Sequence, residues 1–270
     1  MAATVKDLLH QPPRRYGIAR SRWRLQDVGR VLAWLDGVSD PGIYKVLKRL
    51  GFSRKQALNF IQSPDPEYRS KWQRILAAYE QAWIEPDKVV LLFQDEFTYY
   101  RQPTLNRAWH QQGKDQPRAQ QKAGANTKTR LAGVLNAVTG RVTYIQRSKI
   151  GNEALAKFYA QLRAAYPDAE IIYLAQDNWP THKTSTVLTA AANSQVTPLF
   201  LPTYASWLNP IEKLWRWLKQ EVLHLHQHAM DLAPLRQEVC NFLDRFATGS
   251  AELLHYVGIL SKDELPLYPY

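Results

Sequence analysis

Residues 89–96 read VVLLFQDE, an uninterrupted apolar run that ends in a polar residue and two acids. A short run of this kind, bounded by polar residues, predicts a strand that is buried on both faces. The same arrangement returns in IIYLAQDN, residues 171–178. A single Asp after a strand is more often a turn residue. Because α/β sheets build their sites at the carboxyl ends of strands, two such strands favour a site formed by Asp95 and Asp177.

Outward from these two segments the chain alternates between strand and helix patterns. Strands are predicted at residues 131–138, 141–146, 170–175 and 197–201. Helices are predicted at residues 68–83, 152–166, 184–193 and 210–224. Strands in hairpin order followed by strand and helix alternation indicate the α/β class, with a mixed sheet flanked by helices.

A third acid, Glu212, stands in NPIEKLWRWLK, residues 209–219. An Asn-Pro start followed closely by an acid is also the pattern of a helix cap, and a cap needs no catalytic role. Glu212 is nevertheless expected in the first helical turn, and Arg216 and Lys219 follow it on the same face. Clustered carboxylates repel one another unless a cation neutralises them, and oxygen ligands select hard ions such as Mg²⁺ or Mn²⁺. Two such ions are the usual apparatus for attack on a phosphodiester.

The N-terminal segment contains two helical patterns joined by a short turn. They cover residues 25–35 and 40–50, and the second has Pro41 at its start and Gly51 just past its end. A tight helix pair with a basic second helix is typical of a helix-turn-helix DNA-binding domain. An ordinary helical hairpin with a solvated basic face is an equal alternative. The candidate DNA-binding residues are Tyr44, Lys45, Lys48 and Arg49.

The composition indicates a partner that carries negative charge. The 270 residues include 35 Lys and Arg against 24 Asp and Glu, a formal net charge of +11, and nucleic acid is the commonest partner of so basic a protein. Seven of the basic residues lie in residues 101–130. This segment, with Lys128 and Arg130, is expected to contact the DNA backbone, and a merely soluble hairpin is the alternative.

One cysteine, Cys240, excludes an internal disulfide and fits a reducing compartment. The sequence contains no apolar run of the length that a signal peptide or a membrane span requires. We therefore expect a cytoplasmic protein with no membrane partner.

Three motifs give the sequence a specific resemblance. They are FQDE at residues 93–96, QDNWPTH at residues 176–182 and LPTYASWLNPIEKLWRWLKQE at residues 201–221. Between Asp95 and Asp177 there are 81 residues, and between Asp177 and Glu212 there are 34. In motifs and spacing the chain resembles the DDE transposases of bacterial insertion sequences in the mariner-like superfamily, over about residues 14–225.

The resemblance implies an RNase H-like catalytic domain behind a small all-α helix-turn-helix domain. By position in the motifs, the residues that would together bind two ions of Mg²⁺ or Mn²⁺ are Asp95, Asp177 and Glu212. The implied reaction nicks double-stranded DNA at the terminal inverted repeats of the element and joins the 3′-hydroxyl to target DNA, commonly at TA. A homodimer on the DNA and a location at the bacterial nucleoid follow. The residues implied to support the triad or to contact DNA are Asn178, His182, Arg216 and Lys219.

The predicted domains are a helix-turn-helix domain at residues 1–64, a linker helix at 65–86, the catalytic domain at 87–230 and a C-terminal helical extension at 231–270. Family members usually carry a further helix-turn-helix before the segment present here, and this sequence is expected to start almost directly at the second one. Autonomous activity is therefore open. Residues 205–207, Ala-Ser-Trp, replace the commoner Ser-Pro-acid triplet.

Two other functions fit parts of the sequence. A truncated or repurposed derivative of a transposase could bind DNA without cleaving it, although the intact set of acids argues against decay. A glycoside hydrolase would also use Asp and Glu beside aromatic residues, but it leaves the charge of +11 without a role.

Overall fold

The computed structural model describes residues 1–55 and 63–259, and the chain divides into two compact units, Met1–Phe60 and Ile61–Tyr270. The predicted domain boundary at residue 64 follows a stretch, residues 56–62, that lies outside the described residues. The last part of the predicted C-terminal extension, residues 260–270, also lies outside them.

The first unit is a cluster of three helices. They are α1 (Ala2–Leu9), α2 (Leu25–Val31) and α3 (Asp40–Arg49). Leu35 and Ile43 lie in its apolar core, each only 2% exposed. The helices α2 and α3 approach closely, since a Cβ added at Gly29 would meet Ile43 Cδ1 at 2.8 Å. The predicted helix pair is therefore present, and α1, which was not predicted, completes its core.

The second unit is built on a five-stranded mixed sheet in the order β3-β2-β1-β4-β5. The strands are β1 (Val89–Tyr100), β2 (Lys128–Asn136), β3 (Val142–Arg147), β4 (Ile171–Gln176) and β5 (Val196–Phe200). The pairs β1–β2 and β2–β3 are antiparallel, whereas β1–β4 and β4–β5 are parallel. This topology confirms the predicted mixed sheet.

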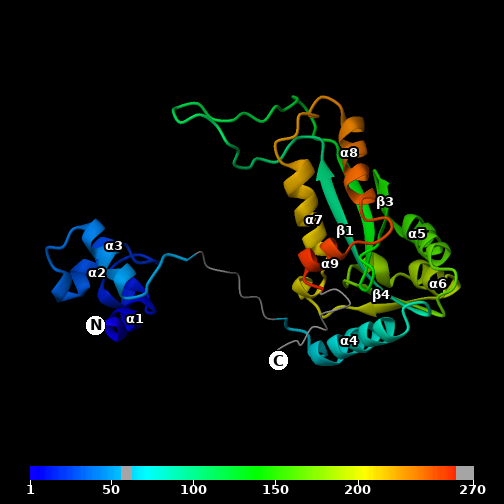
Figure 1. Cartoon of the computed structure of the whole chain (residues 1–270), viewed down its shortest axis with the longest axis horizontal. Coiled ribbons are helices and arrows are strands. Elements are labelled where there is room, and N and C mark those ends of the chain that lie inside the picture. The colour runs from blue at the N-terminus through cyan, green and yellow to red at the C-terminus, as the bar shows by residue number, and fades with distance from the viewer. Residues whose placement is uncertain (56–62, 260–270) are drawn as a thin grey trace. The chain divides into compact units, whose positions relative to one another are not determined.

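Helices cover both faces of the sheet (Figure 1). One face packs against α4 (Tyr68–Ile84), α7 (Ile211–Leu218), α8 (Leu232–Asp244) and α9 (Ala251–Val257). The other face packs against α5 (Asn152–Ala165) and α6 (Ser185–Asn193). Strand β1 is central, because Leu91 and Phe93 enter the first core while Val90 and Leu92 enter the second. The two-sided burial explains why its sequence is apolar without alternation.

Strand β1 is longer than the apolar run predicts. The expected strand stops before Gln94, but β1 continues to Tyr100 because β2 pairs with it along its whole second half, including Asp95 opposite Gly133. The parallel pairing with β4 stops at Phe93 and Ala175. The prediction that Asp95 follows the end of its strand is thus wrong, because Asp95 lies inside β1 and pairs with β2. Asp95 does lie beyond the end of the parallel pairing with β4.

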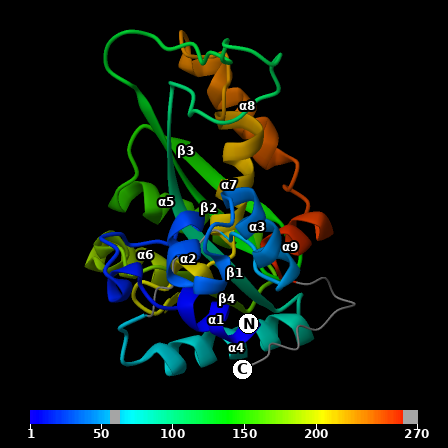
Figure 2. The same cartoon turned by 90° about the vertical axis from the view of Figure 1, so that its left-hand side faces the viewer.

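Between β1 and β2 the chain leaves the sheet as an extended arm, residues 101–127, which projects past one end of the sheet in both views (Figures 1 and 2). The base of the arm is held against the segment that follows α7, because Thr104 and His224 form an isolated bridge. Leu105 and Trp109 on the arm are 74% and 103% exposed. In the described part of the chain, no helix has the length and apolar content that crossing a bilayer requires.

Candidate active site

The three acids singled out in the sequence gather at one end of the sheet. Continuing the parallel register of Phe93 with Ala175 by two residues brings Asp95 level with Asp177. Glu212 lies in the first turn of α7, which packs on the same face as Asp95. Burial, followed by the charges of Glu96, Glu212 and Asp177, raises the pKa of Asp95 to about 8. The acids are therefore close enough to oppose one another's ionisation.

Glu212 lies between negative and positive charge. Burial raises its pKa, Asp177 raises it further, and Lys219 and Arg216 oppose this shift. The predicted basic stripe on α7 is thus near enough to act on the acid. Lys219 also places its Nζ 5.0 Å from the centre of the Phe97 ring on β1.

The start of α7 is fixed by the sheet and not by a cap. In the described structure no side chain caps α7, so the alternative of a simple capping box is wrong. Asn209 is 4% exposed, and its Nδ2 donates to the backbone oxygen of Gln94 over 2.8 Å. The Asn side chain is therefore committed to β1, and this bond holds the helix start beside the acids.

A second cluster of metal-ligand types lies next to the first. Ligand atoms of Glu96, Asp177 and His182 all lie within 4.8 Å of one another. His182 has no exposed surface, and its Nδ1 lies 3.1 Å from Asp177 Oδ1 while its Nε2 lies 3.2 Å from Glu96 Oε1. Burial opposes protonation, but the two carboxylates raise the pKa of His182 to about 9. Since each ring nitrogen faces a carboxylate, we interpret His182 as a link between Asp177 and Glu96.

Glu96 was missed by the sequence reasoning. It follows Asp95 directly, so the two-residue period of a strand sends the two side chains to opposite faces of β1. Glu96 accepts a hydrogen bond from Gln94 Nε2 over 2.8 Å, on the face that carries His182. The sequence held no signal for this contact, because it arises only when the 3₁₀ helix Pro180–Lys183 returns His182 toward β1.

Asp177 responds to its neighbours differently from Asp95. Burial raises its pKa, but the hydrogen bonds from His182 and from the backbone N–H of Trp179 outweigh burial and lower it. Asn178, the next residue, donates to the backbone oxygen of Leu201 over 2.6 Å and accepts from Lys183 Nζ. Asn178 thus ties the loop after β4 to the end of β5.

The candidate DNA-binding residues are exposed on both units. Tyr44, at 45%, and its basic neighbours lie on the exposed side of α3. Lys128 is exposed at the start of β2, and Arg130 is half-buried two residues later. The structure carries side chains of the right charge at these places, and their contact with DNA stays a prediction.

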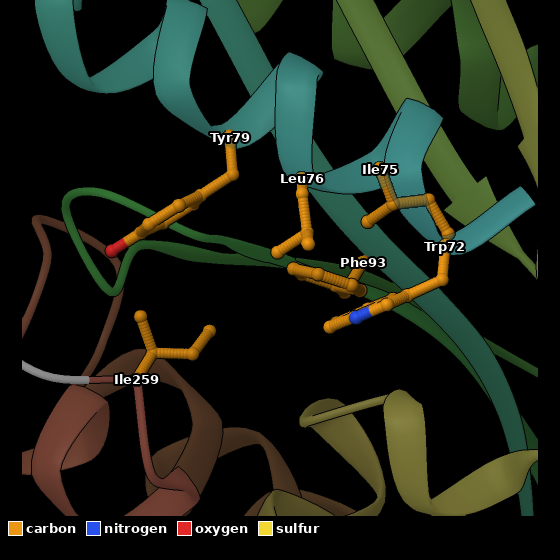
Figure 3. A pocket seen from close by; sticks show the side chains of 6 residues that line it. All are labelled: Trp72, Ile75, Leu76, Tyr79, Phe93 and Ile259. Atoms are coloured by element: carbon orange, nitrogen blue, oxygen red, sulfur yellow. The ribbon is translucent and has the colours of Figure 1, made fainter. Parts of the chain in front are cut away.

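A hollow elsewhere in the second unit lacks the chemistry of a site (Figure 3). It is small, with a volume of about 30 Å³, and lies among α4, β1 and the segment that follows α9. None of its six lining residues is charged, and they are Trp72, Ile75, Leu76, Tyr79, Phe93 and Ile259. We interpret it as imperfect packing of α4 on the sheet.

Comparison with known proteins places the geometry in context. The family model described as DDE superfamily endonuclease matches residues 90–234, more than half of the chain. The insertion element IS630 uncharacterized 39 kDa protein of Shigella sonnei is 25% identical over 247 residues, which cover 89% of this chain and 69% of that protein.

Solved structures share the fold. The crystal structure of the Mos1 strand transfer complex superposes with a TM-score of 0.63 at 15% identity, over 96% of this chain and 74% of that one. The Mos1 mariner paired end complex with Mn gives 0.60 at 15% identity, over 95% and 74%. The match confirms the predicted fold class, an RNase H-like mixed sheet flanked by helices with a helical region ahead of it.

Proposed function

Because the chain belongs to the DDE superfamily endonucleases, we propose that it is a transposase that cleaves DNA at the ends of an insertion element and joins those ends to target DNA. The single observation that supports this most strongly is the convergence of Asp95, Asp177 and Glu212 at one end of the sheet, where their charges act on one another. The match to an insertion element protein supports the same class of reaction.

The donor set fits a pair of divalent cations. The three acids supply oxygen ligands, which suit Mg²⁺ and Mn²⁺. Burial first and the neighbouring acids second raise the pKa of Asp95, and a bound dication would offset both effects. Two bound ions would supply an activated water or 3′-hydroxyl and would stabilise the leaving oxygen of the phosphodiester. Mos1 has been crystallised with Mn and with Mg, which supports the same choice of metal.

Other side chains around the acids would prepare the site. His182 would hold Asp177 in one orientation, since Glu96 fixes the other side of the ring. Asn178 would hold the loop that carries Asp177. Arg216 on α7 and Lys219, which directly follows α7, are both exposed and would contact DNA phosphates beside the acids.

The proposed partner is double-stranded DNA. The Mos1 complexes contain paired transposon ends, and we infer that two copies of this chain pair the ends of its own element. Exposed basic residues on α3 would bind the terminal repeats, and Lys128 and Arg130 would contact the backbone. The bacterial nucleoid is the compartment that contains such DNA.

The decisive experiment is cleavage of a linear DNA that carries the ends of the element, with Mg²⁺ or Mn²⁺. Asp95→Asn, Asp177→Asn and Glu212→Gln should each abolish cleavage while leaving the folded structure intact. Asp168→Asn is the matched control. Asp168 is exposed and lies before β4, whereas Asp177 lies after β4. Wild-type cleavage by a triad variant would refute the assignment of that residue.

The same preparation tests two further parts of the proposal. Light scattering of the complex with element ends should give two copies of the chain on two ends, and one copy would contradict the homodimer. If the wild-type protein binds DNA in a salt-sensitive manner but cleaves it with neither metal, the non-catalytic alternative is correct.

A further inference from the structure

Asp95 receives a hydrogen bond from an aromatic side chain on the helix that carries Glu212. Trp215 Nε1 donates to Asp95 Oδ2 over 3.0 Å. Trp215 is 4% exposed and follows Glu212 by three residues on α7. The contact therefore joins the side chain of one acid to the helix of another.

The indole ring is held by packing on the strands beneath it. It stacks on Phe97, with ring centres 5.5 Å apart and planes 12° from parallel. The ring also lies against Gly133, the residue opposite Asp95 on β2. A Cβ added at Gly133 would lie 2.7 Å from Trp215 Cη2 and 3.1 Å from Cζ2. Glycine at this position thus provides the space that the ring occupies.

We propose that Trp215 is a positioning residue that orients the Asp95 carboxylate and sets its separation from Glu212, and that Gly133 exists to admit the ring. The indole N–H occupies one lone pair of Oδ2, which leaves Oδ1 for a cation. Because the donor is neutral and fixed by stacking, it restrains the carboxylate without competing for the site as a Lys or Arg would. This inference rests on the proposed function only in treating Asp95 as a metal ligand.

The matched test uses two tryptophans of the same helix. Trp215→Phe keeps an aromatic ring and removes the N–H that Asp95 accepts. Trp217→Phe is the control, because Trp217 is 8% exposed on α7 and donates its indole N–H to Glu221, a carboxylate outside the triad. Loss of a group that orients a metal ligand typically costs 10- to 100-fold in affinity or activity. We expect Trp215→Phe to weaken Mn²⁺ binding, measured by calorimetry on the full chain, by about tenfold. Equal affinities in the two variants would overturn the inference.

A readout independent of activity is the indole N–H signal in a nitrogen-15 correlation spectrum. The Trp215 signal is assigned by its loss in Trp215→Phe, and the Trp217 signal by its loss in Trp217→Phe. Titration with Mg²⁺ should shift the Trp215 signal and leave the Trp217 signal in place. If Mg²⁺ shifts neither signal while calorimetry detects binding, Trp215 does not report on the metal site and the proposal fails.

The role of Gly133 is tested by a double-mutant cycle. Gly133→Ala should lower the thermal midpoint of the wild-type chain, and the loss should be smaller in the Trp215→Phe background, where the smaller ring leaves room for a methyl group. Additive losses would show that Gly133 does not serve Trp215. Failure of the proposed function looks different, because Asp95→Asn would then bind Mn²⁺ as tightly as the wild type does.

Discussion

At the residue scale, the titration of Asp95 links pH to metal binding. Its pKa of about 8 means that the metal-free site holds a proton near pH 7, which a cation must displace. Affinity for Mg²⁺ should therefore rise by up to about tenfold per pH unit below pH 8 and level off above it. Calorimetry in buffers of different ionisation enthalpy should detect proton release below pH 8. A flat affinity across this range would contradict the raised pKa.

The same shift affects stability with a definite sign. A carboxyl group whose pKa is higher in the folded state than in the unfolded state stabilises the fold when the pH is below its unfolded-state pKa. That contribution is lost over the interval from the unfolded-state pKa up to about pH 8. The metal-free protein should thus lose stability over this interval, whereas saturating Mg²⁺ should reverse the trend. Asp95→Asn should remove both effects, and its unfolding free energy measured with and without metal is the check.

The raised pKa of His182 makes stability fall with rising pH in the same direction, but its cause is different. Burial opposes its charge, but hydrogen bonds to Asp177 and Glu96 raise its pKa to about 9, so its contribution to stability is present below pH 6.5 and is lost as pH rises through 9. Glu96→Gln should move the pKa of His182 down, since one of its two acidic partners becomes neutral. The pKa is measured from the ring C–H signals by NMR. Glu238→Gln, which alters the more exposed His228 pair, is the control and should leave the His182 titration unchanged.

At the element scale, α4 is an integral part of the catalytic unit. The predicted linker helix packs against the sheet, where Ile75 is 1% exposed. Ile75→Ala should destabilise the second unit by roughly 3 kcal/mol, because a buried cavity replaces a filled position. Arg74→Ala, on the exposed side of the same helix, should change stability by less than about 0.5 kcal/mol. Denaturant titration measures both, and equal effects would show that the packing of α4 contributes nothing.

Elements differ in how far their local sequence determines them. The apolar run before Asp95 predicts a buried strand correctly, since burial on both faces depends only on composition. Its extension to Tyr100 depends on pairing with β2, and the local sequence of β1 does not specify that pairing. The alternative of a cap at Asn209 is wrong for a related reason, because a backbone oxygen on β1 accepts the hydrogen bond of that side chain. Glu96 and Trp215 likewise act through contacts that only the assembled sheet and helix create.

At the scale of the whole molecule, the net charge of +11 coexists with an acidic site. The proposed DNA contacts include Arg216 and Lys219 beside the acids, and also cations on elements that carry none of the three acids in the proposed metal site, α3 and β2. Exposed cations lie on α3 in the first unit and at the start of β2 in the second. At the end of the sheet Asp95 is half-buried, whereas Asp177 and Glu212 are exposed, so a dication from solvent would have access to all three acids.

This separation predicts that DNA affinity and metal affinity can be altered independently. Lys45→Gln and Lys48→Gln on α3 should each reduce the slope of log affinity against log salt by about 1 for DNA that carries the element end. Mn²⁺ binding without DNA should be unchanged in both. Lys157→Gln on α5 removes an equal charge from an exposed helix position and should preserve the slope. Fluorescence anisotropy over a salt series measures the slope, and an unchanged slope in the α3 variants would favour the solvated helical hairpin over the DNA-binding domain.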